Sequence, residues 1–146
     1  MSQHIISLIG NPNCGKTTLF NALTGSRQRV GNWPGVGNFS FEDHDIEVVD
    51  LPGIYSVTPT SVSGEDEIVA RDYLLSGQAQ VVVNIVDASN LERNLYLTSQ
   101  LIEMHVPMIV VVNMLDIAKQ HKIKLDLDAL EKQLGCPVIG LVANRN

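Results

Sequence analysis

The chain has 146 residues, the usual size of one domain, and 45% of them are hydrophobic, which is typical of a packed core and argues against disorder. The formal net charge is −6 and the basic residues are scattered, so a nucleic-acid partner is not expected. Two distant cysteines, Cys14 and Cys136, favour a reducing compartment over a disulfide framework, and no apolar run approaches the length of a membrane span.

Strands and helices are predicted to alternate along the whole chain. In chain order we expect a strand over residues 4–9, a helix over 16–24, a weak strand over 39–41, a strand over 46–50, a helix reaching residue 75, a strand over 81–87, a helix over 91–102, a strand over 108–112, a helix over 126–134 and a strand over 138–141. Ser63 and Asp66 resemble a capping box for the helix that reaches residue 75, and Asp126 is a candidate cap for the helix over 126–134. This alternation predicts a single α/β domain, over residues 1–146, with a mostly parallel sheet.

A phosphate-binding loop is predicted where the first strand meets the first helix. Residues Gly10–Thr17 read GNPNCGKT and match the G-x-x-x-x-G-K-[ST] pattern. Gly10 and Gly15 let the backbone N–H groups close around phosphates, Lys16 supplies a positive charge, and Thr17 offers a hydroxyl to Mg²⁺. A glycine-rich turn with a surface lysine is the alternative. The position between a predicted strand and a predicted helix argues against it.

Two further motifs choose guanine over adenine. Residues Asp50–Gly53 read DLPG after a predicted strand, so Asp50 is expected to reach Mg²⁺ through a water and the Gly53 N–H to meet the γ-phosphate. Residues Asn113–Asp116 read NMLD after another strand, and the Asp116 carboxylate is able to accept both N–H groups that guanine presents and adenine lacks. In isolation the second tetrapeptide is no more than a turn. The order of the three motifs, each at the carboxyl end of a strand, favours a guanine-nucleotide site.

Longer stretches then resemble one family. Residues Gly10–Gly25 look like GTPases of the TrmE–Era–Era-like group. The segments Val30–Val36 (VGNWPGV), Asp50–Ser56 (DLPGIYS) and Val86–Thr98 (VDASNLERNLYLT) are similar to FeoB, a family of ferrous iron transport proteins, as is methionine at position 114. The resemblance covers essentially the whole chain.

What this resemblance implies is a Ras-like P-loop GTPase fold, with helices on both faces of the sheet and the final helix missing. It also implies GTP binding and slow, potassium-stimulated GTP hydrolysis with Mg²⁺, as a switch that regulates or drives Fe²⁺ uptake. FeoB proteins join this G domain to a membrane permease domain. Residues 1–146 are therefore expected to be a piece of a larger protein at the cytoplasmic face of the bacterial inner membrane, soluble by itself, with guanine nucleotide and that permease domain as partners and a homo-oligomer as an option.

The resemblance assigns roles residue by residue. Lys16, Asn13 and Gly53 are the expected catalytic residues; Thr17 and Asp50 serve Mg²⁺, and Asn13 serves K⁺. The alternative for Asn13 is that it only tolerates an unusual loop backbone. The residues expected to contact the nucleotide are Gly10, Asn11, Pro12, Asn13, Cys14, Gly15, Lys16, Thr17, Thr18, Asp50, Leu51, Pro52, Gly53, Asn113, Met114, Asp116, Val142, Ala143 and Asn144.

Two departures from the family pattern bear on hydrolysis. Ile54 stands where many GTPases place a glutamine that orients the attacking water, so no side-chain base is expected. The first switch segment is several residues short, and the family's threonine that closes over Mg²⁺ does not follow Val36. Either this segment is truly deleted, or a disordered loop of the natural protein is missing from the sequence as written. Because switch loops order and disorder with the nucleotide state, we expect the second.

Two other functions compete with the leading one. The first alternative is a GTP/GDP-binding regulatory module with incidental hydrolysis, and the second is an RNA- or ribosome-associated GTPase. The acidic charge counts against the latter. The four histidines, at positions 4, 44, 105 and 121, show no metal-ligand spacing, and no iron site is expected in this domain.

Overall fold

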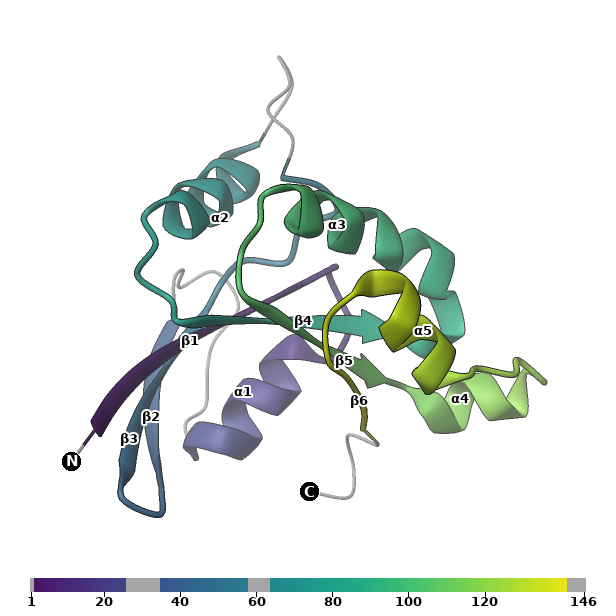
Figure 1. The fold of residues 1–146 in the computed structure, drawn as a ribbon, viewed down its shortest axis with the longest axis horizontal. Helices are drawn as coiled ribbons and strands as arrows, with labels where there is room; N and C mark the ends of the chain where they lie inside the picture. The colour runs from purple at the N-terminus through teal and green to yellow at the C-terminus, as the bar shows by residue number, and fades with distance from the viewer. Residues whose placement is uncertain (1, 26–34, 58–63, 142–146) are drawn as a thin grey trace.

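The structure is a computed structural model that describes residues 2–25, 35–57 and 64–141 (Figure 1). In chain order its elements are β1 (Ser2–Gly10), α1 (Lys16–Thr24), β2 (Gly35–Phe41), β3 (His44–Asp50), α2 (Glu65–Leu75), β4 (Val81–Asp87), the 3-10 turn η1 (Ala88–Asn90), α3 (Leu91–Glu103), β5 (Met108–Asn113), α4 (Leu115–Gln120), α5 (Leu127–Leu134) and β6 (Val138–Gly140). The predicted alternation of strands and helices is confirmed.

All six strands form one sheet, in the order β2-β3-β1-β4-β5-β6. Every neighbouring pair is parallel except β2 and β3, which form an antiparallel hairpin. The central strand β4 reads VVVNIVD and is buried along most of its length, as expected for a strand covered on both faces. The carboxyl ends of β1, β3, β4 and β5 therefore lie at one edge of the sheet, where open α/β sheets bind ligands.

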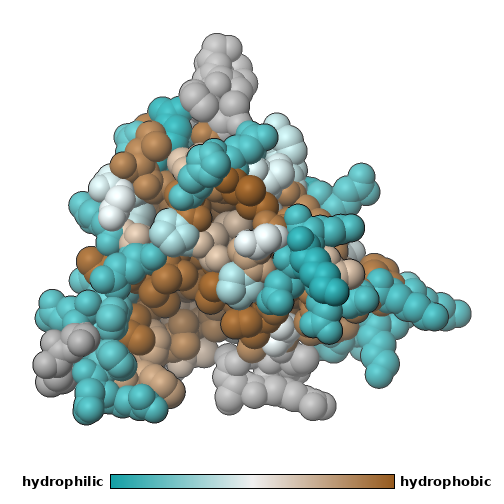
Figure 2. All heavy atoms as spheres, in the orientation of Figure 1, coloured by the Kyte–Doolittle hydropathy of each residue, from teal (hydrophilic) through white to brown (hydrophobic). Residues whose placement is uncertain are grey.

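Helices pack on both faces of this sheet. Helices α2, α3 and α5 cover one face, where Ala70, Leu97 and Leu130 are buried in a common apolar cluster (Figure 1). In the same orientation, apolar residues gather in the middle of the molecule and hydrophilic ones around its rim (Figure 2). The other face carries α1, whose Phe20 is fully buried. Among the described residues no second helix joins α1, and Ile139 on β6 is 51% exposed.

Strand β2 is longer than predicted, because its pairing with β3 outweighs the weak strand propensity of its glycines. The strand begins at Gly35, which pairs with Asp50, whereas the sequence predicted it only from Phe39. Gly37 brings β2 close to α1, since a Cβ atom there would lie 2.7 Å from the Thr24 methyl carbon. A two-residue turn closes the hairpin, with Glu42 at φ 55.

Two helix predictions need correction. Helix α2 starts after Gly64, whose extended backbone makes it the N-cap without a side-chain hydrogen bond. Ser63, the predicted capping residue, lies outside the described residues. Helix α4 was not predicted, because it is only six residues long and follows directly on the Asn113 motif. At α5, Asp126 accepts a hydrogen bond from the Ala129 N–H, so that cap is confirmed. None of the helices in the described ranges has the length and hydrophobicity needed to cross a membrane.

Candidate functional site

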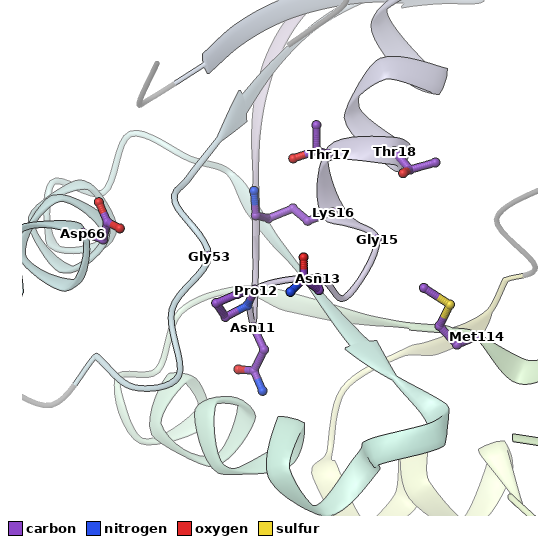
Figure 3. Close-up of a pocket in the computed structure, with 10 residues that line it drawn as sticks. All are labelled: Asn11, Pro12, Asn13, Gly15, Lys16, Thr17, Thr18, Gly53, Asp66 and Met114. Atoms are coloured by element: carbon purple, nitrogen blue, oxygen red, sulfur yellow. The ribbon is translucent and has the colours of Figure 1, made fainter. Parts of the chain in front are cut away.

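The loops that follow β1 and β3 meet around one cavity of about 520 Å³ at the carboxyl edge of the sheet (Figure 3). This volume lies within the range of sites for small ligands. Residues from the loop after β1, from the start of α1, from the loop after β3, from α2 and from the residue after β5 line it: Asn11, Pro12, Asn13, Gly15, Lys16, Thr17, Thr18, Gly53, Asp66 and Met114. Three motifs that are far apart in the sequence thus contribute to one pocket.

The backbone of the first loop alternates between right- and left-handed conformations. Asn13 has φ 66 and Gly15 has φ 97, a pattern that turns successive N–H groups toward one side as an anion-binding nest. Gly15 is also the N-cap of α1, and no side chain caps that helix. Gly10 is required by packing, since a Cβ atom there would lie 2.6 Å from the Cys14 sulfur and from the Ile85 carbonyl oxygen. This loop is built to surround an anion.

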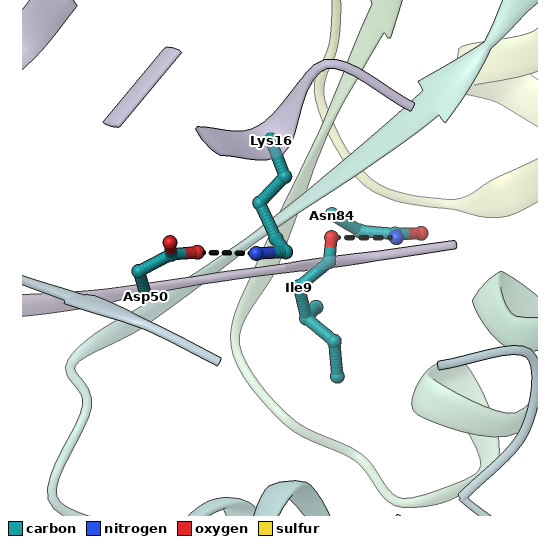
Figure 4. A network of polar contacts seen from close by, with 4 residues as sticks. All are labelled: Ile9, Lys16, Asp50 and Asn84. Carbon is teal, nitrogen blue, oxygen red and sulfur yellow. Dashed lines mark hydrogen bonds and ion pairs between the residues drawn. The ribbon is translucent and has the colours of Figure 1, made fainter. Parts of the chain in front are cut away.

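Lys16 and Asp50 form a buried ion pair at the base of the cavity (Figure 4). The Lys16 Nζ donates to Asp50 Oδ1 at 2.5 Å, and the two side chains are 5% and 0% exposed. Burial raises the pKa of the Asp50 carboxyl, while the adjacent Lys16 ammonium opposes that rise. The second carboxylate oxygen, Oδ2, is buried without a hydrogen-bond partner in the described structure.

A buried amide ties the loop after β5 to the phosphate-binding motif. The Asn113 Nδ2 donates to the Cys14 carbonyl oxygen at 3.1 Å, and the side chain is 1% exposed. Gly15 permits this contact, because a Cβ atom there would lie 2.1 Å from that nitrogen. Met114 follows in a left-handed conformation, with φ 62, and borders the cavity. The Asn113 amide thus fixes the position of Met114 and of the start of α4.

The segment after β3 lies against the first loop. The Ile54 N–H donates to the Gly10 carbonyl oxygen at 3.0 Å. Gly53 approaches so closely that a Cβ atom there would lie 2.9 Å from the Pro12 Cα. The Ile54 side chain is 1% exposed and points into the core, so it is not available to a water in the cavity. The peptide group at Gly53 is what this segment offers to the cavity.

Most of the predicted contact residues are near the cavity, and a few are not. Leu51 is buried in the core and Pro52 is buried beside it, and Asp116 is exposed on α4 and does not line the cavity. Trp33, Pro34, Val142, Ala143 and Asn144 lie outside the described residues. Asp66 was predicted only as a helix cap, yet it lines the cavity (Figure 3). Its position at the cavity depends on where α2 lies in the fold, which no local pattern reveals.

The donor set at this cavity fits hard cations. Thr17 offers a hydroxyl and Asp50 a carboxylate oxygen that lacks a partner in the described structure, the ligand types that Mg²⁺ prefers. Asn13 is exposed and lines the cavity, so its amide oxygen is available to a monovalent cation. Its left-handed backbone also accounts for an asparagine there without any cation. The structure is therefore compatible with both interpretations of Asn13, the cation ligand and the residue that only tolerates the left-handed backbone.

Two other predictions concern groups outside this chemistry. Cys14 is 1% exposed, and burial raises the pKa of its thiol to about 11, so this thiol is not a reactive group. His4 and His44, which are 40 positions apart in the sequence, meet across β1 and β3 with ring nitrogens 3.0 Å apart. Parallel pairing of the two strands produces this contact. No group of three or more histidine, cysteine, aspartate or glutamate side chains suited to a metal ion occurs in the described part of the chain.

Comparison with known proteins agrees with this geometry. Residues 4–146 match the family model described as ferrous iron transport protein B. The chain belongs to this family. The Fe(2+) transporter FeoB of Escherichia coli strain K12 is 59% identical over 152 aligned positions, which cover 99% of this chain and 20% of the relative. That of Salmonella typhimurium is 57% identical over the same coverage.

Solved FeoB structures share the fold. The FeoB G domain of Methanococcus jannaschii superposes with a TM-score of 0.90 at 48% identity, covering 100% of this chain and 90% of that one. The cytosolic domain of Legionella FeoB (L. pneumophila) gives a TM-score of 0.87 at 48% identity, covering 97% of this chain and 64% of that one. An S. thermophilus NFeoB bound to mGMPPNP gives 0.83 at 49% identity, covering 97% of this chain and 56% of that one. The predicted Ras-like GTPase fold is confirmed.

Length separates this chain from its relatives in two ways. It spans about a fifth of the FeoB transporters that it matches. The alignment runs over 152 positions whereas the chain has 146 residues, so the relatives carry additional positions. The hairpin from Gly35 to Asp50 is continuous, and residues 26–34, which include most of the first switch segment, lie outside the described residues.

Proposed function

We propose that this chain binds a guanine nucleotide with Mg²⁺ and hydrolyses GTP slowly, as the switch domain of a ferrous iron transporter. The observation that carries this proposal is the convergence of the Gly10–Thr17 loop, Gly53 and Met114 on one cavity. Solved relatives bound to GDP and to mGMPPNP, at 48% and 49% identity, support the choice of ligand. These groups bind the anionic nucleotide locally, so the proposal does not require a positive net charge, and the net charge of the chain is negative.

Phosphate binding requires the buried ion pair to separate. Lys16 is held by Asp50 at 2.5 Å, and its proposed role is to turn from this carboxylate to the β- and γ-phosphates. Asp50 is then free to accept a hydrogen bond from a water of the Mg²⁺ shell, with Thr17 as a direct ligand. Mg²⁺ when bound neutralises charge on the β- and γ-phosphate oxygens. One residue pair thus exchanges an internal contact for two contacts with the ligand.

Guanine recognition is assigned to the loop after β5. The contact between the Asn113 amide and the Cys14 carbonyl holds this loop against the phosphate site, so the base and the phosphates are read by one connected unit. The Met114 side chain is placed to pack on the face of the base. Asp116 begins α4 as its second residue and is exposed, ready to accept the two N–H groups of guanine. Residues 142–144 are also proposed to contact the base.

Hydrolysis has to proceed without a side-chain base at position 54, because the Ile54 side chain is buried in the core. We assign the γ-phosphate contact to the Gly53 N–H and charge stabilisation to Lys16. Asn13 would hold a potassium ion through its amide oxygen, and that ion would supply further positive charge to the site. A site with no general base is expected to turn over slowly.

The test is steady-state GTP hydrolysis in K⁺ compared with Na⁺, with ATP as the control nucleotide. Asn13→Gly and Asn13→Ala separate the two interpretations of Asn13, because glycine accepts the left-handed backbone without supplying an oxygen. If Asn13 binds K⁺, both variants lose the potassium stimulation and keep GDP binding. If only the backbone matters, Asn13→Gly keeps the stimulation. Equal binding of ATP and GTP would refute the proposed function.

A binding module with incidental hydrolysis is the second candidate, favoured by one observation. The sequence contains no threonine between Thr24 and Thr58, and β2 pairs with β3 from Gly35 onward. As the chain stands, no first-switch threonine is available to close over Mg²⁺. Tight GDP and GTP binding with negligible turnover in both K⁺ and Na⁺ would favour this candidate.

Iron uptake belongs to the proposal for the whole protein. The matched relatives are Fe(2+) transporters about five times the length of this chain, so the missing part is proposed to include the membrane permease domain. In that setting, Fe²⁺ is the cargo of the permease and the nucleotide state of this domain regulates its passage. The domain would then lie at the cytoplasmic face of the membrane.

A further inference from the structure

Helix α3 lies beside the segment that follows β3 and holds it through one glutamine (Figure 1). The Gln100 Oε1 accepts a hydrogen bond from the Val57 backbone N–H at 2.8 Å and another from the Ser56 hydroxyl at 3.0 Å. The Gln100 side chain is 8% exposed and Val57 is 4% exposed. The Val57 hydrogen bond is buried, where a lost partner is costly, and the Ser56 hydrogen bond is part-buried.

The other end of the same segment is fixed to β1 and to the loop after it. The Leu51 N–H donates to the Leu8 carbonyl oxygen at 3.1 Å, and the Ile54 N–H donates to the Gly10 carbonyl oxygen at 3.0 Å. Gly53 lies between these contacts and reaches the cavity. The segment is thus anchored on the sheet side by main-chain hydrogen bonds and on the helix side by Gln100.

A second contact between α3 and this segment is weaker. The Arg93 guanidinium lies over the Tyr55 ring at 4.4 Å from its centroid, but both residues are exposed. Exposed cation–π contacts contribute little compared with a buried hydrogen bond to a main-chain N–H. Gln100 therefore makes the stronger of these two polar contacts, beside the apolar packing of Ile54 and Val57 in the cluster that includes Leu97 and Leu101 of α3.

We propose that Gln100 is a positioning residue for recognition of the γ-phosphate. It acts through the Val57 and Ser56 hydrogen bonds, which keep residues 54–57 against α3 and so keep Gly53 at the cavity. This inference rests on the proposed function. A diphosphate lacks the γ-phosphate that is proposed to meet Gly53, so Gln100 sets the preference of the site for a triphosphate over a diphosphate and leaves diphosphate affinity unchanged.

The test compares the affinities of Gln100→Met for GDP and for a non-hydrolysable GTP analogue, measured by calorimetry. Methionine keeps the length of the side chain and removes the oxygen acceptor. We expect analogue affinity to fall about tenfold, which corresponds to about 1.4 kcal/mol, while GDP affinity stays within about twofold of wild type. Gln100→Glu restores an acceptor oxygen and is expected to regain most of the lost analogue affinity.

Ile102→Ala is the matched control, because it removes a partly buried apolar side chain from the same helix. It is expected to lower the thermal midpoint and to leave the ratio of analogue to GDP affinity unchanged. If Gln100→Met does not fold, Ser56→Ala removes one of the two hydrogen bonds and has to shift the ratio in the same direction. An unchanged ratio in the folded Gln100 variant, or an equal change in Ile102→Ala, overturns the inference alone. A wild-type chain that binds neither nucleotide overturns the proposed function itself.

Discussion

The buried pair of Lys16 and Asp50 predicts a strong energetic coupling in the nucleotide-free protein. The two side chains are 5% and 0% exposed and meet at 2.5 Å. Lys16→Met leaves the Asp50 carboxylate buried without its countercharge, and breaking a buried ion pair in this way costs about 3–5 kcal/mol of the free energy of unfolding. The double variant Lys16→Met/Asp50→Asn removes both charges. We expect it to lose at least about 2 kcal/mol less than the sum of the two single variants.

The same perturbation predicts a pH dependence with a definite sign. Burial raises the pKa of Asp50, and Lys16 opposes that rise, so removing Lys16 raises this pKa further. The folded state of Lys16→Met then retains the Asp50 proton at a pH where the unfolded state has released it. The stabilising contribution of Asp50 in this variant is therefore fully present below about pH 4 and is lost as pH rises through the folded-state pKa, by at most about 1.4 kcal/mol per pH unit. The Asp50→Asn background removes this contribution.

Urea unfolding of the wild type, both single variants and the double variant, without nucleotide, measures the cycle. Repeating it at several pH values between 4 and 8 measures the titration of Asp50. Losses that add to within about 0.5 kcal/mol would refute the coupling. A Lys16→Met variant that becomes more stable as pH rises, relative to the double variant, would refute the assignment of the titration to a buried Asp50.

Two further predictions concern the base and the thiols. Asp116→Asn replaces a carboxylate acceptor with an amide, so GDP affinity is expected to fall at least about tenfold. Xanthosine diphosphate presents a carbonyl where guanine presents an amine, so its affinity is expected to rise. Competition binding measures both affinities, and unchanged GDP affinity would contradict the role of Asp116. Cys14 is 1% exposed with a thiol pKa of about 11, so roughly a thousandth of it is thiolate at pH 8 and iodoacetamide should modify the half-buried Cys136 first. Peptide mapping by mass spectrometry follows both thiols, and equal rates would contradict the burial of Cys14.

Features that depend on local patterns were predictable from the sequence. The apolar runs predicted the parallel strands, and the position of each motif at the end of a strand predicted which loops would meet. The α5 cap at Asp126 followed from a local side-chain hydrogen bond. The phosphate-binding loop followed from glycine spacing, and the left-handed φ of Gly15 agrees with it.

Features that depend on long-range packing were not predictable in this way. Strand β2 starts early because Gly37 allows close contact with Thr24 of α1, although glycine is unfavourable in strands. Asp66 lines the cavity from α2, and the sequence shows it only as a polar residue near a helix start. The contact between His4 and His44 follows from strand register. Each involves residues distant in the chain and no repeated spacing.

Asp50 and Gly53 connect the cavity to the surrounding elements of the fold. With β2 paired to Asp50 from Gly35 onward, Asp50 is held from two sides, by β2 across the sheet and by Lys16 in the cavity. Gly53 lines the cavity and lies against Pro12, so its proposed contact with a γ-phosphate would report that this phosphate is present. Gly53 is positioned through Ile54 on one side and Gln100 on the other. A structural change at the γ-phosphate can therefore be transmitted from the site to the rest of the domain through α3.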